Sequence, residues 1–465
     1  MLKRFGTGAG WSRAVLCLLA GLAVGQAVRA ASAAAGTAPE GPAYPLKASS
    51  NNRYLVDQKN APFLMVGDSP QSLIGNLTLP EAALYMQNRA RYGINTLWIN
   101  LLCNDGTACN ADGSTRDGIA PFRTPGDLAT PNPIYFQKVD AVLDLAAKQN
   151  MLILLDPIET IGWLKVLRAN GIAKARDYGG YLGNRYRRYT NIVWMHGNDF
   201  QTWRDMADGA LVRAVASGIR SAAPQHLQTI ELNYLSSGSL DASAWALSID
   251  LDAAYTYYPT YAQVLKEYNR RRFLPVFLVE ANYEFEHLGN TDGGSPLNLR
   301  RQEYWTMLSG AAGQLYGSAF TWRFPAGWRD KLDTPGVREL SLMKKLFATR
   351  RWYALVPDQE HMTVVDGYGQ FFPKGSITND SYVAAARTAD GSLVMAYMPF
   401  ARTISVDMSR LARAALGRWY DPTNGTYRQI GTATLPNTGI RQFTPPGKNS
   451  TGDSDWVLVL DGSPD

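Results

Sequence analysis

Short apolar runs alternate with helical patterns over most of this chain of 465 residues, and this alternation restricts the folds open to it. From Phe63 onward, eight apolar runs are typical of buried strands, and helical stretches separate nearly all of them. The expected strands are 63–67, 94–102, 151–155, 192–196, 227–232, 251–257, 274–279 and 316–321. Strands that alternate with helices build a parallel sheet. Eight of them in roughly 290 residues predict an α/β fold, a closed (β/α)8 TIM barrel.

An open, doubly wound sheet is the alternative fold, but no Gly-rich phosphate loop follows the first expected strand. Helices are expected after Pro80 and at 134–149, 173–189, 203–222, 261–271, 299–312 and 337–348. Their lengths and positions between the strands suit the outer ring of a barrel. The alternation therefore favours the closed arrangement.

After Tyr353 the long helical patterns disappear, and short alternating runs bounded by Gly, Asp, Asn and Pro turns replace them. These runs are 382–386, 393–397, 403–406, 418–420 and 456–460. They predict a small C-terminal antiparallel β-sandwich of about a hundred residues. We therefore expect a barrel domain over 44–352 and a sandwich domain over 353–465.

The first residues are typical of an export signal. Lys3, Arg4 and Arg13 precede an apolar segment at 14–24, and small residues around Ala30 offer a cleavage site. The segment is shorter than the ~20 residues that a bilayer crossing needs. We expect a signal peptide over 1–30, a disordered linker over 31–43, and a secreted or periplasmic protein without membrane association after cleavage.

Removal of that signal lowers the formal charge from +6 to +2, because residues 1–30 hold four basic and no acidic side chains. A nucleic-acid partner is therefore not expected. Cleavage also leaves only Cys103 and Cys109, close together in a Gly/Asn/Asp-rich loop. An exported chain permits a disulfide there, with two free thiols as the alternative. Two cysteines and four scattered histidines do not suit a zinc site, so no metal or cofactor is expected.

Two carboxylates stand at expected strand ends. Asp199 follows the fourth strand, and Glu280 ends the seventh. In a barrel these ends face each other across the rim, as a retaining glycosidase pair ~5–5.5 Å apart would require. We assign Asp199 as the acid/base and Glu280 as the nucleophile. Each alone would be read as a solvated or salt-bridged loop carboxylate, and Asp156 and Glu159 after the third strand have a similar appearance.

Other polar and aromatic residues lie beside these strand ends, where they would bind substrate. They are Asp68, Asn100, Asn198, Tyr257, Trp322 and Arg323. The Asn198 amide would bond a sugar hydroxyl, the Tyr257 phenol would bond the nucleophile, and the Trp322 indole would stack on a sugar face. Asp68 and Asn100 cap the first and second strands and would complete a polar floor, or could instead be loop-initiating residues. His196 is read as a core histidine.

Several motifs resemble one family of enzymes. They are FLMVGDSPQ (63–71), GINTLWINLL (93–102), RYRRYTNIVWMHGND (185–199), VEAN (279–282), YWTMLSGAAGQLYGSAFTW (304–322), LDTPGVREL (332–340), MAYMPF (395–400), RWYDPTNGTYR (418–428) and DWVLVL (455–460). The chain resembles the apiosidase-like glycoside hydrolases, which carry a C-terminal module named for collagen binding. The resemblance implies a retaining barrel hydrolase with Asp199 and Glu280 in the catalytic positions, and release of apiose from a plant pectic side chain.

The patterns together predict an exported glycoside hydrolase that acts on an oligo- or polysaccharide. It would release a terminal sugar, apiose-like or other, from a plant or microbial polysaccharide. A non-catalytic carbohydrate- or matrix-binding surface protein is the alternative. A lyase for acidic polysaccharide, with Tyr257 as the base and Arg323 as the clamp, is a second one.

Overall fold

The computed structural model describes residues 41–201, 206–233, 235–286 and 293–462. The predicted signal peptide lies outside the described residues, as does the predicted linker up to residue 40. Residues 203–205 of the helix expected at 203–222 also lie outside them. None of the helices in the described part of the chain combines the length and the apolar character that a bilayer crossing requires.

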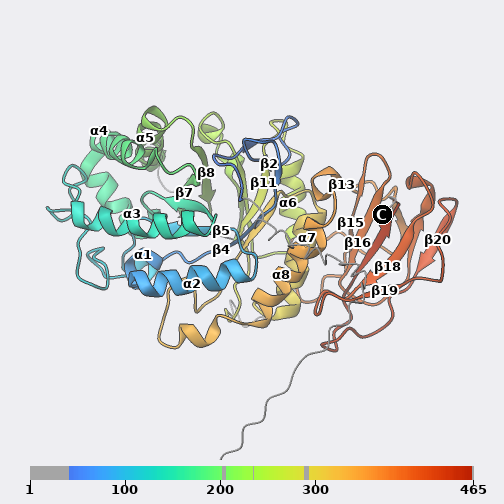
Figure 1. Cartoon of the computed structure of the whole chain (residues 1–465). Helices are drawn as coiled ribbons and strands as arrows, with labels where there is room; N and C mark the ends of the chain where they lie inside the picture. The colour runs from blue at the N-terminus through green and yellow to red at the C-terminus, as the bar shows by residue number, and fades with distance from the viewer. Residues whose placement is uncertain (1–40, 202–205, 234, 287–292, 463–465) are drawn as a thin grey trace, which may run out of the picture. The chain divides into compact units, whose positions relative to one another are not determined.

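Eight parallel strands form the central sheet (Figure 1). They are β4 (Met65–Asp68), β5 (Thr96–Asn100), β6 (Leu152–Asp156), β7 (Ile192–Phe200), β8 (Leu227–Leu232), β10 (Asp252–Thr256), β11 (Val276–Glu280) and β12 (Gly313–Tyr316). β4 pairs with both β5 and β12, which brings the first and the last of these strands together. The expected (β/α)8 barrel is confirmed.

The barrel is nearly closed, with a seam between β8 and β10. A short strand, β9 (Ser236–Gly238), runs antiparallel to β10 there. The Ser239 hydroxyl bridges the seam, since it donates to the Ile230 carbonyl oxygen at 2.5 Å and accepts from the Ala253 amide at 2.9 Å. Side-chain and loop hydrogen bonds thus replace a regular ladder at this point.

Apolar side chains fill the barrel interior, including the buried Met65, Trp98, Leu154, Met195 and Phe277. A small antiparallel sheet precedes the first barrel strand, and its Leu55 and Phe63 join the same apolar cluster. Its strands are β1 (Lys47–Ala48), β2 (Leu55–Val56) and β3 (Pro62–Phe63). This packed interior leaves polar chemistry to the carboxyl ends of the strands.

Helices surround the sheet and begin at clear sequence signals. They are α1 (Leu73–Asn76), α2 (Leu79–Arg91), α3 (Pro133–Lys148), α4 (Thr160–Tyr186), α5 (Met206–Ala222), α6 (Thr260–Tyr268), α7 (Pro296–Leu308) and α8 (Pro335–Ala348). Thr78 and Glu81 form a capping box at the start of α2. Proline stands in the first turn of α2, α3, α7 and α8, where its missing N–H costs nothing.

Two elements differ from their expected ranges. α4 begins at Thr160 rather than at 173, because the Glu159 side chain caps it and Gly171, at φ 74°, separates two helical segments. β12 ends at Tyr316, where the expected strand began. Glycine and glutamine at the start of this strand weaken its apolar pattern in the sequence. Glycine is required at 313, because a Cβ there would lie 2.1 Å from the Met65 carbonyl oxygen of β4. Trp322 and Arg323 therefore follow a loop instead of a strand end.

The C-terminal residues form two antiparallel sheets, as a β-sandwich requires. The larger holds β13 (Leu355–Pro357), β15 (Ala384–Thr388), β16 (Leu393–Met398), β18 (Leu416–Tyr420), β19 (Tyr427–Gln429) and β21 (Trp456–Asp461). The smaller holds β14 (Val364–Asp366), β17 (Ile404–Asp407) and β20 (Ile440–Phe443). One apolar cluster contains residues of both sheets, among them Ile404, Phe443 and Leu458, and the expected sandwich is confirmed.

The sandwich packs on α7. Arg300 of this helix is buried and pairs with Asp455 at 2.8 Å, Asp453 at 2.7 Å and Glu339 of α8 at 2.7 Å. The described residues from Gly41 to Gly462 form one compact unit. We keep the boundary between 352 and 353 as a proposal, supported by the start of β13 at Leu355.

Candidate active site

The carboxyl end of β7 turns sharply at the residues that carry the predicted acid. Gly197, Asn198 and Asp199 all have positive φ values, of 110°, 67° and 54°. This conformation is unusual for residues other than glycine and is found where the surroundings enforce it. The Thr160 hydroxyl contacts the carbonyl oxygens of Gly197 at 2.7 Å and Asn198 at 3.0 Å. The Asp199 amide donates to Glu231 Oε2 of β8 at 3.1 Å.

Glu280 ends β11 and is held by two tyrosines. The Tyr257 hydroxyl donates to its Oε1 at 2.7 Å, and the Tyr283 hydroxyl donates to its Oε2 at 2.8 Å. Glu280 is only 9% exposed. These two O–H donors favour the ionised form of Glu280, which burial opposes.

Tyrosine and amide side chains link the surroundings of the two predicted catalytic residues. Tyr255 donates to Asp199 Oδ1 at 2.8 Å, and its ring lies 5.6 Å from the ring of Tyr257. On the other side, Gln71 accepts from the Asn198 amide and donates to the Tyr283 hydroxyl, both at 3.2 Å. Polar groups at the carboxyl ends of β7, β10 and β11, and in the segment after β4, thus form one network.

Burial shifts the acidity of the carboxyl groups in this network. It raises the pKa of Glu280 to about 8, to which the charge of Asp199 adds, while the Tyr257 and Tyr283 hydroxyls oppose the rise. Burial also raises the pKa of Asp199, against the Tyr255 hydroxyl. The pKa of Glu231 lies well above its usual value because of burial and the charges of Glu280 and Asp199. The cluster therefore retains protons at neutral pH.

Unpartnered polar atoms lie at neighbouring strand ends. Asn100, the last residue of β5, is fully buried, and neither polar atom of its side chain bonds another described residue. Asp156 ends β6 beside Asn100. Its Oδ1 accepts from the Ile158 amide, while its Oδ2 has no partner within the described ranges. Glu159, in contrast, caps α4 by accepting from the Gly162 amide.

Asp68 is engaged within the protein, at the end of β4. Its Oδ2 accepts from Arg89 Nε at 2.6 Å and from the Tyr85 hydroxyl at 2.5 Å, and its Oδ1 accepts from the Ser69 amide. All of these groups are buried. The carboxylate therefore ties β4 to α2, and its predicted contact with substrate stays a prediction.

Trp322 and Arg323 lie on the loop after β12. Trp322 is partly exposed and donates from Nε1 to Glu286 at 2.7 Å. Arg323 is exposed, with its guanidinium 5.4 Å from the Trp322 ring centroid. His196 is buried in β7 and contacts Gln228 Oε1 at 2.9 Å. Burial lowers its pKa to about 4, as suits a neutral core histidine.

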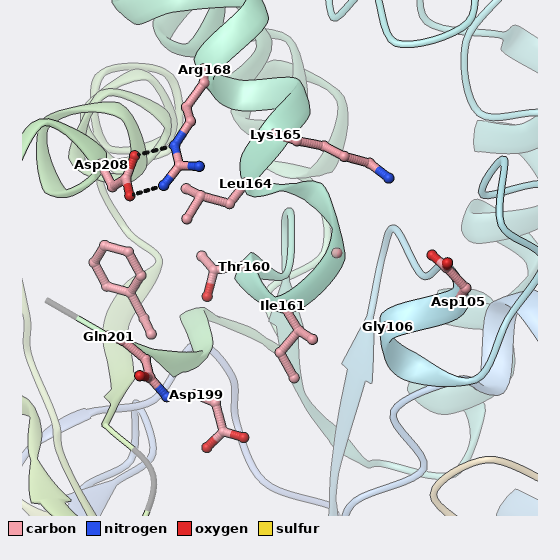
Figure 2. Close-up of a pocket in the computed structure, with 12 residues that line it drawn as sticks. Asp105, Gly106, Thr160, Ile161, Leu164, Lys165, Arg168, Asp199, Gln201 and Asp208 are labelled. Atoms are coloured by element: carbon pink, nitrogen blue, oxygen red, sulfur yellow. Dashed lines mark hydrogen bonds and ion pairs between the residues drawn. The ribbon is translucent and has the colours of Figure 1, made fainter. Parts of the chain in front are cut away.

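A cavity of about 640 Å³ adjoins Asp199 (Figure 2). Residues from the first turns of α4 line it, together with Phe200, Gln201 and the Arg168–Asp208 ion pair. Figure 2 shows the Asp199 carboxylate at the opposite end of the cavity from this ion pair. Glu280 is not among the lining residues, so the cavity lies on the Asp199 side of the network.

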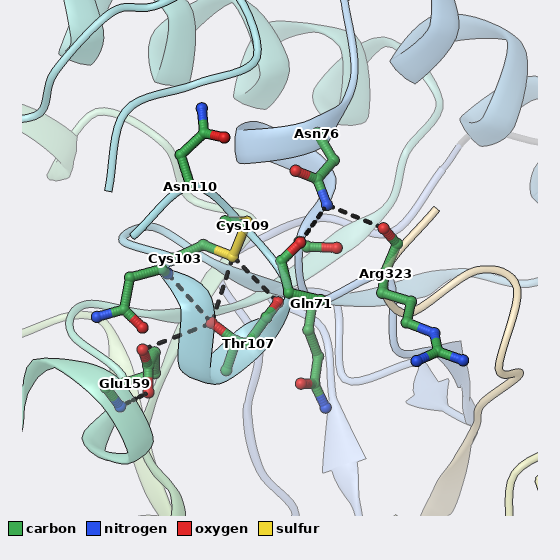
Figure 3. Close-up of a disulfide and its surroundings, with 12 residues drawn as sticks. Gln71, Asn76, Cys103, Thr107, Cys109, Asn110, Glu159 and Arg323 are labelled. Carbon is green, nitrogen blue, oxygen red and sulfur yellow. Dashed lines mark hydrogen bonds between the residues drawn. A yellow bond between two sulfur atoms is a disulfide. The ribbon is translucent and has the colours of Figure 1, made fainter. Parts of the chain in front are cut away.

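Cys103 and Cys109 form the predicted disulfide, with Cα atoms 5.6 Å apart (Figure 3). Asn76 of α1 donates to the carbonyl oxygens of Ala108 and Arg323, both at 2.9 Å. It thereby joins the disulfide loop to the loop that carries Trp322. Among the described residues, no group of three or more His, Cys, Asp or Glu side chains is placed to hold a metal ion.

The sequence model described as "Apiosidase-like, catalytic domain" matches residues 49–354. The chain belongs to the apiosidase-like glycoside hydrolase family. A second model, described as "Putative collagen-binding domain of a collagenase", matches residues 371–461. No curated protein matches the sequence.

Solved structures agree with this apiosidase-like hydrolase in fold. One titled "Glycoside hydrolase" has a TM-score of 0.78 and 22% identity, over 90% of this chain and 97% of that one. A glycoside hydrolase family 5 protein from Bacteroides vulgatus ATCC 8482 has a TM-score of 0.77 and 21% identity, over 90% and 93%. Both therefore share the fold over nearly their whole length.

Sequence patterns did not single out several residues of the site in this apiosidase-like hydrolase: Gln71, Glu231, Tyr255 and Tyr283. Glu231 is the penultimate residue of β8, in a run that reads as an ordinary strand. Tyr255 lies within β10, two residues before the predicted Tyr257. Tyr255 and Tyr257 are two residues apart in the expected strand 251–257, and this spacing could have indicated Tyr255, since residues two apart in a strand point the same way.

Proposed function

We propose that this hydrolase releases a terminal sugar from a plant or microbial polysaccharide by a retaining mechanism, with Asp199 as the acid/base and Glu280 as the nucleophile. The observation that supports it most is the hydrogen bonding at these two strand ends, where Tyr255 bonds Asp199 and where Tyr257 and Tyr283 bond Glu280. The charge of Asp199 raises the pKa of Glu280. Tyr255 and Tyr257 connect the same two groups.

In the form that starts the reaction, the proton lies on Asp199 and Glu280 is ionised. Two hydroxyl donors stabilise a charge on Glu280, and one stabilises a charge on Asp199. Hydrogen bonds to an ionised group favour that form. Once Asp199 holds a proton, its charge no longer opposes the ionisation of Glu280. One neutral acid beside one carboxylate is what a retaining pair needs.

The reaction then runs in two steps. The Glu280 carboxylate attacks the anomeric carbon while Asp199 gives its proton to the leaving oxygen, and the glycosidic bond breaks. Asp199 next takes a proton from water, which attacks the same carbon and frees Glu280. The cavity beside Asp199 suits the leaving group, because the departing oxygen must lie next to the proton donor.

Matched variants test these roles. Asp199→Asn should slow hydrolysis of a natural glycan by about 10²–10⁴-fold. It should slow a nitrophenyl glycoside less, because that leaving group needs no proton. Glu280→Gln should abolish turnover of both substrates. Glu303→Gln removes another buried carboxyl group, on α7, and serves as the control with normal activity. Wild-type rates in Asp199→Asn or Glu280→Gln would reject the assignment.

Substrate and location complete the proposal. The family assignment supports an apiose-like terminal sugar, and a panel of plant and microbial glycans with mass spectrometry of the products would identify it. Proton NMR of the first product formed should show the anomer of the substrate. The Cys103–Cys109 disulfide supports export to an oxidising compartment, secreted or periplasmic.

A further inference from the structure

Glu231 of β8 lies beneath the turn that carries Asp199. Thr160 holds the carbonyl side of this turn, through Gly197 and Asn198. Glu231 holds its amide side, because Oε2 accepts the Asp199 N–H at 3.1 Å. Asn198 and Asp199 keep a left-handed backbone, which is strained for residues other than glycine. A turn of this kind persists only where its surroundings hold it.

The surroundings of Glu231 favour an uncharged carboxyl group. Its side chain is 1% exposed, and its Oε1 bonds no other described residue. A buried carboxylate with a single N–H donor would be costly. The ionisable groups that act on it or feel its charge are Asp199 of β7, Glu280 of β11, Asp156 of β6, Tyr255 of β10 and Tyr283 after β11. Charges on these acids oppose a further negative charge.

We propose that Glu231 is a positioning residue that acts as a neutral acid and holds the Asp199 turn through its carbonyl oxygen. The inference rests on the proposed role of Asp199 and adds a third carboxyl group to the site. Neutrality matters because an ionised Glu231 would add a negative charge beside Asp199 and Glu280. That charge would oppose the ionised form of the Glu280 nucleophile and would make Asp199 a weaker acid, so both would hinder the first step.

Two substitutions of Glu231 distinguish the effect of its hydrogen-bond acceptor from the effect of a charge. Glu231→Gln keeps a neutral carbonyl acceptor, so kcat should stay within about threefold of wild type and both limbs of the pH–rate profile should stay in place. Glu231→Leu removes the acceptor, so kcat should fall about 100-fold with little change in KM, as expected for a misplaced catalytic group. Asp252→Asn, a buried acid at the start of β10, is the control and should keep normal activity.

Hydrogen exchange at the Asp199 amide gives a readout that needs no activity. Exchange should be faster in Glu231→Leu and unchanged in Glu231→Gln. Full activity in Asp199→Asn would overturn the proposed function, and this exchange would still decide the role of Glu231. Wild-type exchange and kcat in Glu231→Leu would overturn the inference. So would a Glu231→Gln variant as slow as Glu231→Leu, or one whose alkaline limb moves down by more than half a pH unit.

Discussion

At the scale of single residues, opposing forces act on Glu280. Burial and the charge of Asp199 disfavour its ionised form, and the hydroxyls of Tyr257 and Tyr283 favour it. Perturbed carboxyl groups of this kind are concentrated at active sites. The environment that tunes the pKa of Glu280 for catalysis therefore also lowers the stability of the folded state when Glu280 is ionised, and both effects are measurable.

Glu280→Gln should remove a pH dependence of stability. The pKa of Glu280 is raised from 4.5 to about 8 on folding, so its contribution is complete below pH 4.5 and is lost as pH rises toward 8. The free energy of unfolding of the wild type should fall relative to the variant by up to about 1.4 kcal/mol for each pH unit in this window. Urea denaturation at several pH values measures it. Parallel curves for the two proteins would contradict this expectation.

Removal of single tyrosine hydroxyls should move different limbs of the pH–rate profile. Tyr257→Phe and Tyr283→Phe each remove a donor from Glu280, so the pKa of Glu280 and the acidic limb of kcat/KM should rise by about one pH unit. Tyr255→Phe removes the donor from Asp199, so the alkaline limb should rise instead. These three variants control for one another. Movement of the same limb in all of them would refute the separate roles.

At the scale of elements, the irregular end of β7 positions Asp199. The pairing of β7 with β8 becomes irregular between His196 and Phe200. This irregularity turns the chain so that Asp199 meets Tyr255 of β10 and Glu231 of β8. Strand ends that depart from regular pairing are common beside active sites, where they re-aim a side chain.

Gly197→Ala should damage this turn specifically. A Cβ there would lie 2.1 Å from the Glu231 carbonyl oxygen, in addition to the strain of φ 110°. We expect a loss of at least 3 kcal/mol, on the order of strain plus overpacking, and a large fall in kcat. Gly171→Ala is the matched control, since Gly171 has φ 74° but no atom within 4 Å of its Cβ position. It should lose about 1 kcal/mol and no activity. Thermal denaturation and kcat decide between them.

At the scale of the whole molecule, buried charges join the sandwich to the barrel. Arg300 is almost completely buried with Asp455, and Glu339 is also buried, while Asp453 is partly exposed. Removal of one partner from a buried ion pair leaves the other charge uncompensated. We infer that barrel and sandwich unfold together.

Arg300→Met should therefore cost about 3–5 kcal/mol of unfolding free energy. The wild type should show a single calorimetric transition, and the variant should show a lower or split one. Lys174→Met removes the ion pair with Asp127, in which the lysine side chain is 48% exposed, and should change stability by less than about 1 kcal/mol. Equal effects of the two substitutions would show that the Arg300 cluster does not couple the two parts.

The sequence by itself determined the barrel, the sandwich and the strand ends that carry Asp199 and Glu280, because apolar periodicity and turn residues are local properties of the chain. The Cys103–Cys109 disulfide could be predicted for the same reason, since the two cysteines are close in sequence. The predicted limits of an element were wrong where the local pattern was weak. In β12, for example, Gly313 is required by the close approach of β4 and weakens the apolar pattern.

Only the tertiary structure decided which polar side chains meet. Glu231 reads as an ordinary strand residue until folding brings β8 against the Asp199 amide. The sequence predicts that Asp68 lies in the floor of the substrate site, whereas in the fold Arg89 and Tyr85 of α2 donate hydrogen bonds to it. Hydrogen-bond partners and burial depend on contacts between residues far apart in sequence. The chain's pattern therefore reveals where the site lies, and packing assigns each carboxyl group its partners and its proton.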